Sequence, residues 1–472
     1  RMKKMLMALS LSGALLGGSA VVWAEDAAST PVAAEQTMAA TDTAAATPET
    51  VVTEVPATEE ATPAAEAAPT VDTGDTAWIL VSTALVLLMT IPGLALFYGG
   101  MVRKKNVLST MMFSLSAAIL VSLIWVIAGY SLAFSGTGAY FGDLSKAFLN
   151  GVAFDALSGT IPESLFVIFQ MTFAIITVAI ISGSIADRMK YSAFMAFIAV
   201  WVILVYAPIT HWVWAADGWL FKAGALDFAG GTVVHINSGV AGLVAAYMLG
   251  KRTGLGRESM APHNLTLTVV GASLIWVGWF GFNGGSALGA GARASMAILV
   301  TQVAAAAAAF SWLVVERVVR GKASVLGGAS GAVAGLVVIT PAAGFVGVGG
   351  ALVMGLIGGV VCFWGITALK RLLKADDALD AFGLHAVGGM VGAVLTGVFY
   401  SDEIIKAAGV VLAPTFAGQL WIQVEGVLAT IAYSAVVTFI ILKVIDLVIG
   451  IRVSADDERM GLDLSQHGER IE

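Results

Sequence analysis

Eleven long apolar runs dominate this sequence and restrict what it can fold into. About 20 apolar residues in a helix span the roughly 30 Å hydrocarbon core of a bilayer, and each run is of that length. Hydrophobic residues make up 58% of the chain and charged residues 12%, whereas a soluble domain has about 25% charged residues. This composition excludes a soluble enzyme and a nucleic-acid-binding protein with a basic face. The runs are 77–99, 107–134, 163–186, 191–214, 228–249, 264–284, 295–315, 325–341, 345–369, 381–400 and 418–449.

The loops between the apolar runs alternate in charge, and this alternation predicts the orientation of the chain. Loops after the first, third, fifth, seventh and ninth runs contain fourteen Lys and Arg residues, and loops after the even-numbered runs contain four. Cytoplasmic loops carry the excess of basic residues in membrane proteins. We therefore predict an all-α polytopic membrane protein with eleven transmembrane helices, its N-terminus outside and its C-terminus inside.

Two segments precede the first membrane run. Residues 1–24 contain three bases and no acid, and an apolar stretch then ends in small residues at Ala24, which is the pattern of a cleaved signal peptide. A retained anchor helix is the alternative. Residues 25–76 hold eleven acids, no base and no aromatic residue, which is too little apolar surface to fold. We predict a signal peptide over 1–24 and a disordered, acidic, Ala/Thr/Pro-rich leader over 25–76.

The sequence offers no residue set for a cofactor or a metal. Its one cysteine, Cys362, excludes a disulfide framework and any Cys-based zinc or iron–sulfur site. Gly327, Gly331 and Gly335 recur every fourth residue, which favours close helix packing in a membrane. No strand–loop–helix pattern surrounds them, so a nucleotide-binding loop is the weaker interpretation. We expect no enzymatic activity, no cofactor and no metal.

Two motifs recur in matching runs and predict an internal repeat. The pattern His-x3-Gly-x2-Gly begins at His235 in the fifth run and at His385 in the tenth, and an acid (Asp227 or Asp380) precedes each. The first run ends in LFYGG and the sixth in GFNGG. Copies of five helices have opposite orientations, an arrangement that places transporter sites at the repeat interface. We predict two inverted five-helix repeats (runs 1–5 and 6–10) and a final helix.

His235 and His385 are the candidate functional side chains. An ionisable side chain at membrane depth is costly and normally faces a cavity, a pore or a partner. Two separate core histidines are the simpler interpretation, and a metal site is a third, although two histidines alone fit zinc or copper poorly. The repeat favours one His–His pair. Burial disfavours charge, so we expect neutral rings that offer one donor and one acceptor nitrogen each to a polar solute or a proton.

Aromatic side chains gather near the predicted outer ends of three runs. Trp214 ends the fourth run, Phe169 and Phe173 are four residues apart on the third, and Phe282 precedes Ser286 by four on the sixth. Interfacial tryptophans are commonly only membrane anchors. An aromatic cluster with one hydroxyl would attract a small cation by about 0.5–2 kcal/mol per ring, too little to replace the hydration shell of a bare ion. We predict weak recruitment of a cation that then loses its charge.

Five longer motifs carry more specific information than the histidines and aromatic residues alone. They are DFAGGTVVHINSGVAGLVAAYMLGKR at 227–252, FQMTFA at 169–174, GWFGFNGGS at 278–286, ITPAAG at 339–344 and DAFGLH at 380–385. Over about residues 75–472 the chain resembles the ammonium transporter family in these motifs. The resemblance implies a membrane domain over 77–450 and a homotrimer of eleven-helix subunits with one pore each. It also implies transport of ammonium or ammonia, with methylammonium as an analogue, across the cytoplasmic (inner) membrane of a bacterium.

The resemblance also implies an outer ammonium site formed by Phe173, Trp214 and Ser286. Asp227 would be the buried acid that supports this site. Whether Asp227 contacts the ion or caps a helix N-terminus stays open at this stage, and capping is the simpler interpretation.

Two further pairs follow from the resemblance. Phe173 and Phe282 would stack as a gate below the outer site, and His235 and His385 would be the twin-histidine pair of the pore. The sequence departs from the common family pattern at residues 215–217, where glycines often follow the tryptophan.

The residues after 450 are polar and by themselves predict a solvated cytoplasmic tail. The resemblance implies that 451–472 is a regulatory tail that packs on the cytoplasmic face and takes part in control by a PII-type signal protein. Two other functions stay open. A Rhesus-type gas channel for ammonia or carbon dioxide would share the histidines, although Trp214 and Ser286 argue against it. A membrane sensor would need an output domain, for which this tail is too short, but an ammonium sensor that acts through a partner stays open.

Overall fold

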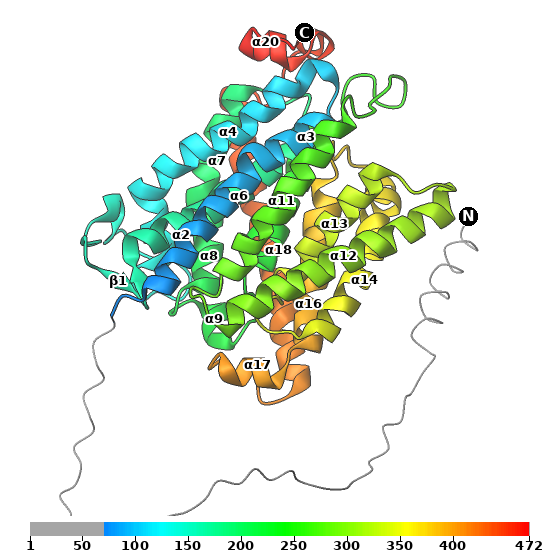
Figure 1. Ribbon diagram of the computed structural model, residues 1–472. Coiled ribbons are helices and arrows are strands. Elements are labelled where there is room, and N and C mark those ends of the chain that lie inside the picture. Colours follow the sequence, from blue (N-terminus) through cyan, green and yellow to red (C-terminus); the bar gives the residue numbers. More distant parts are fainter. Residues whose placement is uncertain (1–69, 472) are drawn as a thin grey trace, which may run out of the picture. The chain divides into compact units, whose positions relative to one another are not determined.

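Helices account for nearly all regular structure in residues 70–471, the part of the chain that the computed structural model describes (Figure 1). Within this part, ten helical segments are long and apolar enough to cross a bilayer. The prediction of an all-helical, multi-pass membrane protein is therefore confirmed. The eighth predicted run forms the shorter helix α13 (Val325–Ile339) of 15 residues. At 1.5 Å per residue it is about 22 Å long, less than the roughly 30 Å of a hydrocarbon core.

Six of the ten segments consist of more than one element. In chain order, the ten segments are α2 (Thr73–Leu88), η1 (Met89–Leu94) and α3 (Ala95–Met101); η2 (Lys104–Asn106), α4 (Val107–Ile124), η3 (Trp125–Gly129) and α5 (Tyr130–Phe134); α6 (Glu163–Ile185); α7 (Tyr191–Trp201), η5 (Val202–Tyr206), α8 (Ala207–Trp214) and α9 (Trp219–Ala223); η6 (Gly231–Ile236) and α10 (Asn237–Leu249); α11 (Leu265–Gly285); α12 (Ala292–Arg320); α14 (Val348–Trp364), η7 (Gly365–Leu369) and α15 (Lys370–Leu373); η8 (Phe382–Ala386) and α16 (Val387–Phe399); and α18 (Phe416–Val448). The elements outside them are η4 (Ala147–Leu149), the antiparallel strands β1 (Leu157–Ser158) and β2 (Ile161–Pro162), α17 (Asp402–Ala407), α19 (Ala455–Met460) and α20 (Leu462–His467).

The most buried segments carry the candidate site. Of the ten segments, α6 and η6–α10 are the most buried and α18 is the least. α6 and α10 pack directly against each other. α18 exposes large apolar side chains such as Trp421 and Phe439, as expected of a helix that faces lipid. The candidate site therefore lies among the inner helices, away from the lipid-facing surface.

Small residues let α13 approach α12 closely, as the glycine spacing predicts. A Cβ atom at Gly335 would lie 2.3 Å from the backbone oxygen of Ala304, and one at Gly331 would lie 2.7 Å from the Cβ of Trp312. Any larger side chain at these positions would push the two helices apart. The close contact fixes α13 against α12 in the interior of the bundle.

The two ends of the helical bundle carry different elements. α20 lies at one end, and α9, α17 and β1 lie at the opposite end (Figure 1). The first helix begins at Thr73, where Asp72 accepts a hydrogen bond from the N–H of Asp75, so it starts before the predicted position 77. The predicted signal peptide (1–24), and the predicted leader up to residue 69, lie outside the described residues.

Candidate functional site

His235 and His385 lie side by side in the interior of the bundle. Their Nδ1 atoms are 3.2 Å apart, and their rings stack with centroids 5.3 Å apart and planes inclined by 24°. The two residues are 1% and 4% exposed. One imidazole can donate its Nδ1–H to the Nδ1 of the other, which leaves the two Nε2 atoms for other partners. The structure thus brings the two histidines together as one pair.

Asp227 closes the first turn of the helix that carries His235. Its carboxylate accepts hydrogen bonds from the backbone N–H groups of Gly230, Gly231 and Thr232, at 2.8, 2.6 and 2.8 Å. It also accepts one from the hydroxyl of Thr232. A helix start leaves its first N–H groups without intrahelical partners, and a carboxylate there satisfies them. These bonds hold Asp227 in a capping geometry.

The matching acid in the second repeat motif is Asp377 rather than Asp380. Asp377 stands eight residues before His385, as Asp227 stands eight before the other histidine. Its carboxylate accepts hydrogen bonds from two backbone N–H groups at the start of η8, at 3.2 and 2.9 Å, and from the Ser184 hydroxyl at 2.7 Å. Asp380 instead pairs with Lys370 at 2.6 Å. The common eight-residue offset is the sequence signal that identifies the cap.

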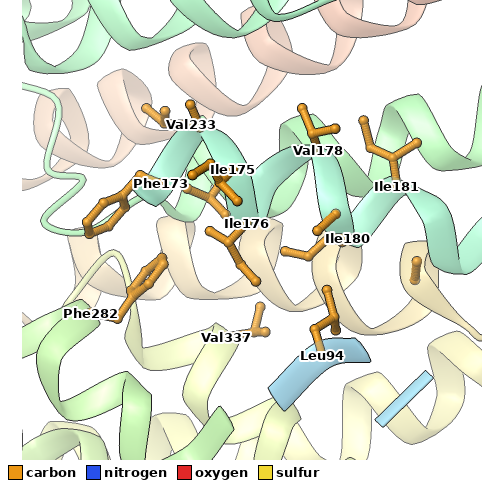
Figure 2. Close-up of a cluster of buried hydrophobic side chains, with 14 of the residues drawn as sticks. Leu94, Phe173, Ile175, Ile176, Val178, Ile180, Ile181, Val233, Phe282 and Val337 are labelled. Atoms are coloured by element: carbon orange, nitrogen blue, oxygen red, sulfur yellow. The ribbon is translucent and has the colours of Figure 1, made fainter. Parts of the chain in front are cut away.

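A stack of aromatic rings leads to the histidine pair. Trp214 meets Phe173 edge-on at a centroid distance of 5.7 Å, and Phe173 lies 4.4 Å from Phe282. Phe282 in turn stacks on His235 at 6.0 Å. Figure 2 shows the rings of Phe173 and Phe282 side by side, one from α6 and one from α11. Both phenylalanines are almost fully buried, so the two rings close the space between Trp214 and the histidines.

The side chains above this ring pair are more open. Trp214 and Ser286 are both partly exposed. The indole N–H of Trp214 donates to the backbone oxygen of Asp227 at 2.9 Å, and the Ser286 hydroxyl donates to the backbone oxygen of Phe282 at 2.8 Å. The Ser286 oxygen keeps its lone pairs free to accept a hydrogen bond from a solute. Of the predicted outer-site residues, Trp214 thus contacts the Phe173 ring, and Ser286 bonds to the backbone of Phe282.

A narrow apolar cavity lies around the histidine pair. It leaves about 10 Å³ for the centre of a water molecule, which is room for roughly one. Figure 2 shows Ile176 and Ile180 of α6 on the side that faces Leu94 and Val337. The Nε2 atom of His235 is buried and has no hydrogen-bond partner among residues 70–471. The lining residues are Met89, Leu94, Phe97, Ile176, Ile180, His235, Ile275, Trp279, Phe282, Val333 and His385.

Trp279 is a site residue that the sequence reasoning missed. Its indole stacks on His235 with centroids 5.4 Å apart and planes inclined by 19°. Its N–H donates to the Thr340 hydroxyl at 2.9 Å, which fixes the ring. Trp279 precedes Phe282 by three residues, so both share one face of α11, and that spacing is the signal that could have found it. Among residues 70–471, no group of three His, Cys, Asp or Glu side chains is placed to hold a metal ion.

The C-terminal tail packs on loops at one end of the bundle instead of extending into solvent. The Glu458 carboxylate accepts from the N–H and hydroxyl of Thr253, at 2.6 and 2.8 Å, and pairs with Arg452 at 2.8 Å. Asp463 accepts from the N–H of Ser109 at 2.7 Å. Burial acts to raise the pKa of Glu458, but the hydrogen bonds from Arg452 and Thr253 outweigh it and hold the pKa below its usual value. The tail therefore packs against the helical bundle, and its position on the cytoplasmic face stays a prediction.

A buried ion pair connects this tail contact with the second histidine segment. Thr253 follows Arg252, whose guanidinium binds both carboxylate oxygens of Asp376, at 2.8 and 3.1 Å. Asp376 directly precedes the capping residue Asp377. Both members of the ion pair are buried, so loss of Arg252 would remove the partner of a buried carboxylate, whereas Arg252 also lies 3.7 Å from Asp187. The tail is therefore linked through contiguous polar contacts to the start of η8.

Sequence comparison finds close relatives of nearly full length. The profile of the Ammonium Transporter Family matches residues 77–471. An ammonium transporter of Bacillus subtilis (strain 168) is 51% identical over 399 residues, which cover 84% of this chain and 98% of that protein. The ammonium transporter Amt1 of Archaeoglobus fulgidus is 46% identical over 399 residues, with 84% and 98% covered.

Solved structures have the same fold. The crystal structure of Saccharomyces cerevisiae Mep2 matches with a TM-score of 0.76 and 38% identity, over 82% of this chain and 88% of that chain. A structure titled Sensor Amt Protein matches with a TM-score of 0.77 and 30% identity, over 84% and 98%. The profile match and the near full-length identities agree with the fold of the solved structures. The chain belongs to the ammonium transporter family.

Proposed function

We propose that this protein moves ammonium across the cytoplasmic membrane of a bacterium by recruiting the ion, removing its proton and conducting ammonia. Phe173, Trp214 and Ser286 form the outer ammonium site, and Asp227 supports it by capping the adjoining helix. The observation that carries this proposal is the continuous stack from Trp214 through Phe173 and Phe282 to His235. It joins a partly open cation site to a closed apolar passage.

The energies of the passage explain why the ion has to lose its proton. Moving an isolated charge from water into a medium of low dielectric constant costs tens of kcal/mol in the idealised limit. The aromatic faces of the outer site contribute only about 0.5–2 kcal/mol each. The cavity around the histidines is lined by apolar side chains apart from the two imidazoles and one indole. Ammonium can release a proton and continue as a neutral molecule, whereas potassium has no such route.

The histidine pair provides the path for the proton. With Nδ1 atoms 3.2 Å apart, the two neutral rings share one hydrogen bond, and their Nε2 atoms present one donor and one acceptor. Phe173 and Phe282 act as the gate above them, because rings 4.4 Å apart leave no water path. Ammonia passes along the pair while a proton moves between the nitrogen atoms.

The proposal also includes the topology of the chain and its oligomeric state. Eleven spans form two inverted five-helix repeats and a final helix, with α13 as the eighth span, the N-terminus outside and the C-terminus inside. The two capped half-helices support the repeat, because Asp227 and Asp377 hold the starts of η6 and η8 in the same way. Three subunits form a homotrimer in which each has its own pore. Residues 1–24 are a signal peptide, and an acidic leader follows from residue 25 up to the membrane domain, which begins with α2 at Thr73 and ends at residue 450.

Residues 451–472 form a regulatory tail on the cytoplasmic face, where a PII-type signal protein can reach it. Two observations support regulation through this segment. Glu458 and Asp463 are almost fully buried, the first against the loop that holds Thr253 and the second against the start of α4, and the Arg252–Asp376 pair lies between the tail contact and the start of η8. Displacing the tail would remove a hydrogen-bond partner from loops that position His385.

Current recording on proteoliposomes tests the function directly. We expect current with ammonium and with methylammonium and none with potassium. No current together with a fast pH change would instead identify a gas channel of the Rhesus type. The match to a structure titled Sensor Amt Protein indicates that this fold is also found in a sensor, so absence of both current and pH change would favour sensing through a partner.

A further inference from the structure

Arg293 lies at the start of α12, where its cationic side chain has an unusual set of partners. Its guanidinium carbon is 4.9 Å from the ring centroid of Phe228 and 5.0 Å from that of Phe345. Its Nε donates a hydrogen bond to the backbone oxygen of Gly344 at 3.1 Å. Among residues 70–471, Arg293 forms no salt bridge within 4 Å. Two aromatic faces and one carbonyl therefore hold the cation.

The Phe228 ring that Arg293 covers is tightly confined. It meets Phe345 edge-on at a centroid distance of 5.7 Å, and its backbone N–H donates to the oxygen of Pro341 at 3.0 Å. A Cβ atom at Gly344 would lie 2.2 Å from the ring, so the neighbouring backbone leaves no space on that side. The planar guanidinium of Arg293 lies against the Phe228 and Phe345 rings and so connects them to α12.

Phe228 directly follows Asp227, which contacts both parts of the proposed pathway. The backbone oxygen of Asp227 accepts from the indole N–H of Trp214 at 2.9 Å. Its carboxylate holds the N–H groups at the start of η6, which carries His235. A shift of Phe228 would therefore move the acceptor that orients Trp214 and the cap of the histidine segment together.

We propose that Arg293 is a positioning residue for the outer ammonium site and acts through Phe228 and Asp227. The inference rests on the proposed function, because it takes Trp214 to be part of that site. A fixed cation near a cation site could also act by repulsion. The two roles predict opposite signs: loss of a positioning residue weakens the apparent affinity for ammonium, and loss of a repelling charge strengthens it.

The transport test compares three variants by ammonium currents on proteoliposomes over a range of concentrations. Arg293→Met keeps a long apolar side chain without charge or N–H donors, and we expect it to raise KM about tenfold with little change in maximal current. Arg293→Lys keeps the charge over the rings but loses the planar fork, so we expect a KM between wild type and Arg293→Met. The control is Arg320→Met, at the opposite end of α12, where the guanidinium lies 5.2 Å from the Phe363 ring and also pairs with Glu316 at 3.0 Å; its KM should stay unchanged.

A second measurement is independent of transport. Hydrogen exchange of the backbone amides of residues 230–232 should be faster in Arg293→Met than in wild type, and largely restored in Arg293→Lys. A KM that falls or stays constant in Arg293→Met, or unchanged exchange at these amides, would overturn the proposal. If wild-type protein carries no ammonium current, the proposed function fails, and the exchange measurement alone still decides whether Arg293 holds this segment.

Discussion

Replacing Asp227 by alanine should remove the acceptor of four buried backbone N–H groups at once. Those of Gly230, Gly231, Thr232 and Val233 lie 2.6–3.4 Å from its carboxylate oxygens. A buried donor left without an acceptor costs about 1–3 kcal/mol, so Asp227→Ala should lower the free energy of unfolding by roughly 4–12 kcal/mol. Asp227→Asn can keep an oxygen at the Oδ1 position, which binds two of the four groups. Its amide nitrogen would face the other two, so this variant should cost about 2–6 kcal/mol.

The two variants are compared by denaturant unfolding in detergent and by ammonium transport kinetics. If Asp227 acts as a cap, Asp227→Asn is less stable but transports ammonium with a KM close to wild type. Asp217→Asn is the matched control, because Asp217 is a partly exposed acid between α8 and α9 that pairs with Lys222 at 2.7 Å; neither quantity should change. An Asp227→Asn protein of wild-type stability whose KM rises about tenfold or more would refute capping and assign the carboxylate to the ion.

The gate and the tail give two further predictions. Phe282→Ala removes the ring that lies 4.4 Å from Phe173, so we expect faster water permeation in stopped-flow measurements on proteoliposomes; an unchanged rate would argue against a gate. Glu458 has a lowered pKa because hydrogen bonds from Arg452 and Thr253 outweigh burial. A lowered pKa stabilises tail packing above the usual glutamate range, and this contribution is lost as the pH falls through the lowered value. Hydrogen exchange of residues 455–467 should therefore quicken on acidification, and Glu458→Gln should show fast exchange already at pH 7; slow exchange in that variant would contradict the role of the carboxylate.

The sequence was most informative where a local pattern repeats. The recurrence of the histidine motif predicted that His235 and His385 would form a pair, and their Nδ1 atoms are 3.2 Å apart. The four-residue spacing of Phe169 and Phe173 predicted a shared helix face, and their ring centroids are 5.0 Å apart. Periodic patterns of this kind report on one helix or on one repeat, and both are set by local geometry.

Contacts between distant segments could not be read in the same way. Asp380 is the acid closest to His385 in sequence, but the cap is Asp377, because only that residue reaches the free N–H groups of η8. The tail is polar and by itself reads as solvated. Glu458 is nevertheless only 1% exposed, because it packs against Thr253. That residue lies on a loop 205 residues earlier in the chain. Such pairings depend on tertiary packing, which the polarity of a segment does not encode.

We propose that selectivity arises from deprotonation at the histidine pair, with Trp214, Phe173 and Ser286 only concentrating the cation. Potassium flux into proteoliposomes tests it most directly. Wild type should exclude potassium, and His235→Ala and His385→Ala should each impair ammonium transport or its selectivity while the protein still assembles.

An acid at either position could hold a bare cation, so His235→Glu and His385→Glu should each admit potassium, whereas Trp214→Leu should only weaken the apparent affinity for ammonium. Histidine variants that still exclude potassium, together with a Trp214→Leu protein that admits it, would place selectivity in the outer site and contradict this account.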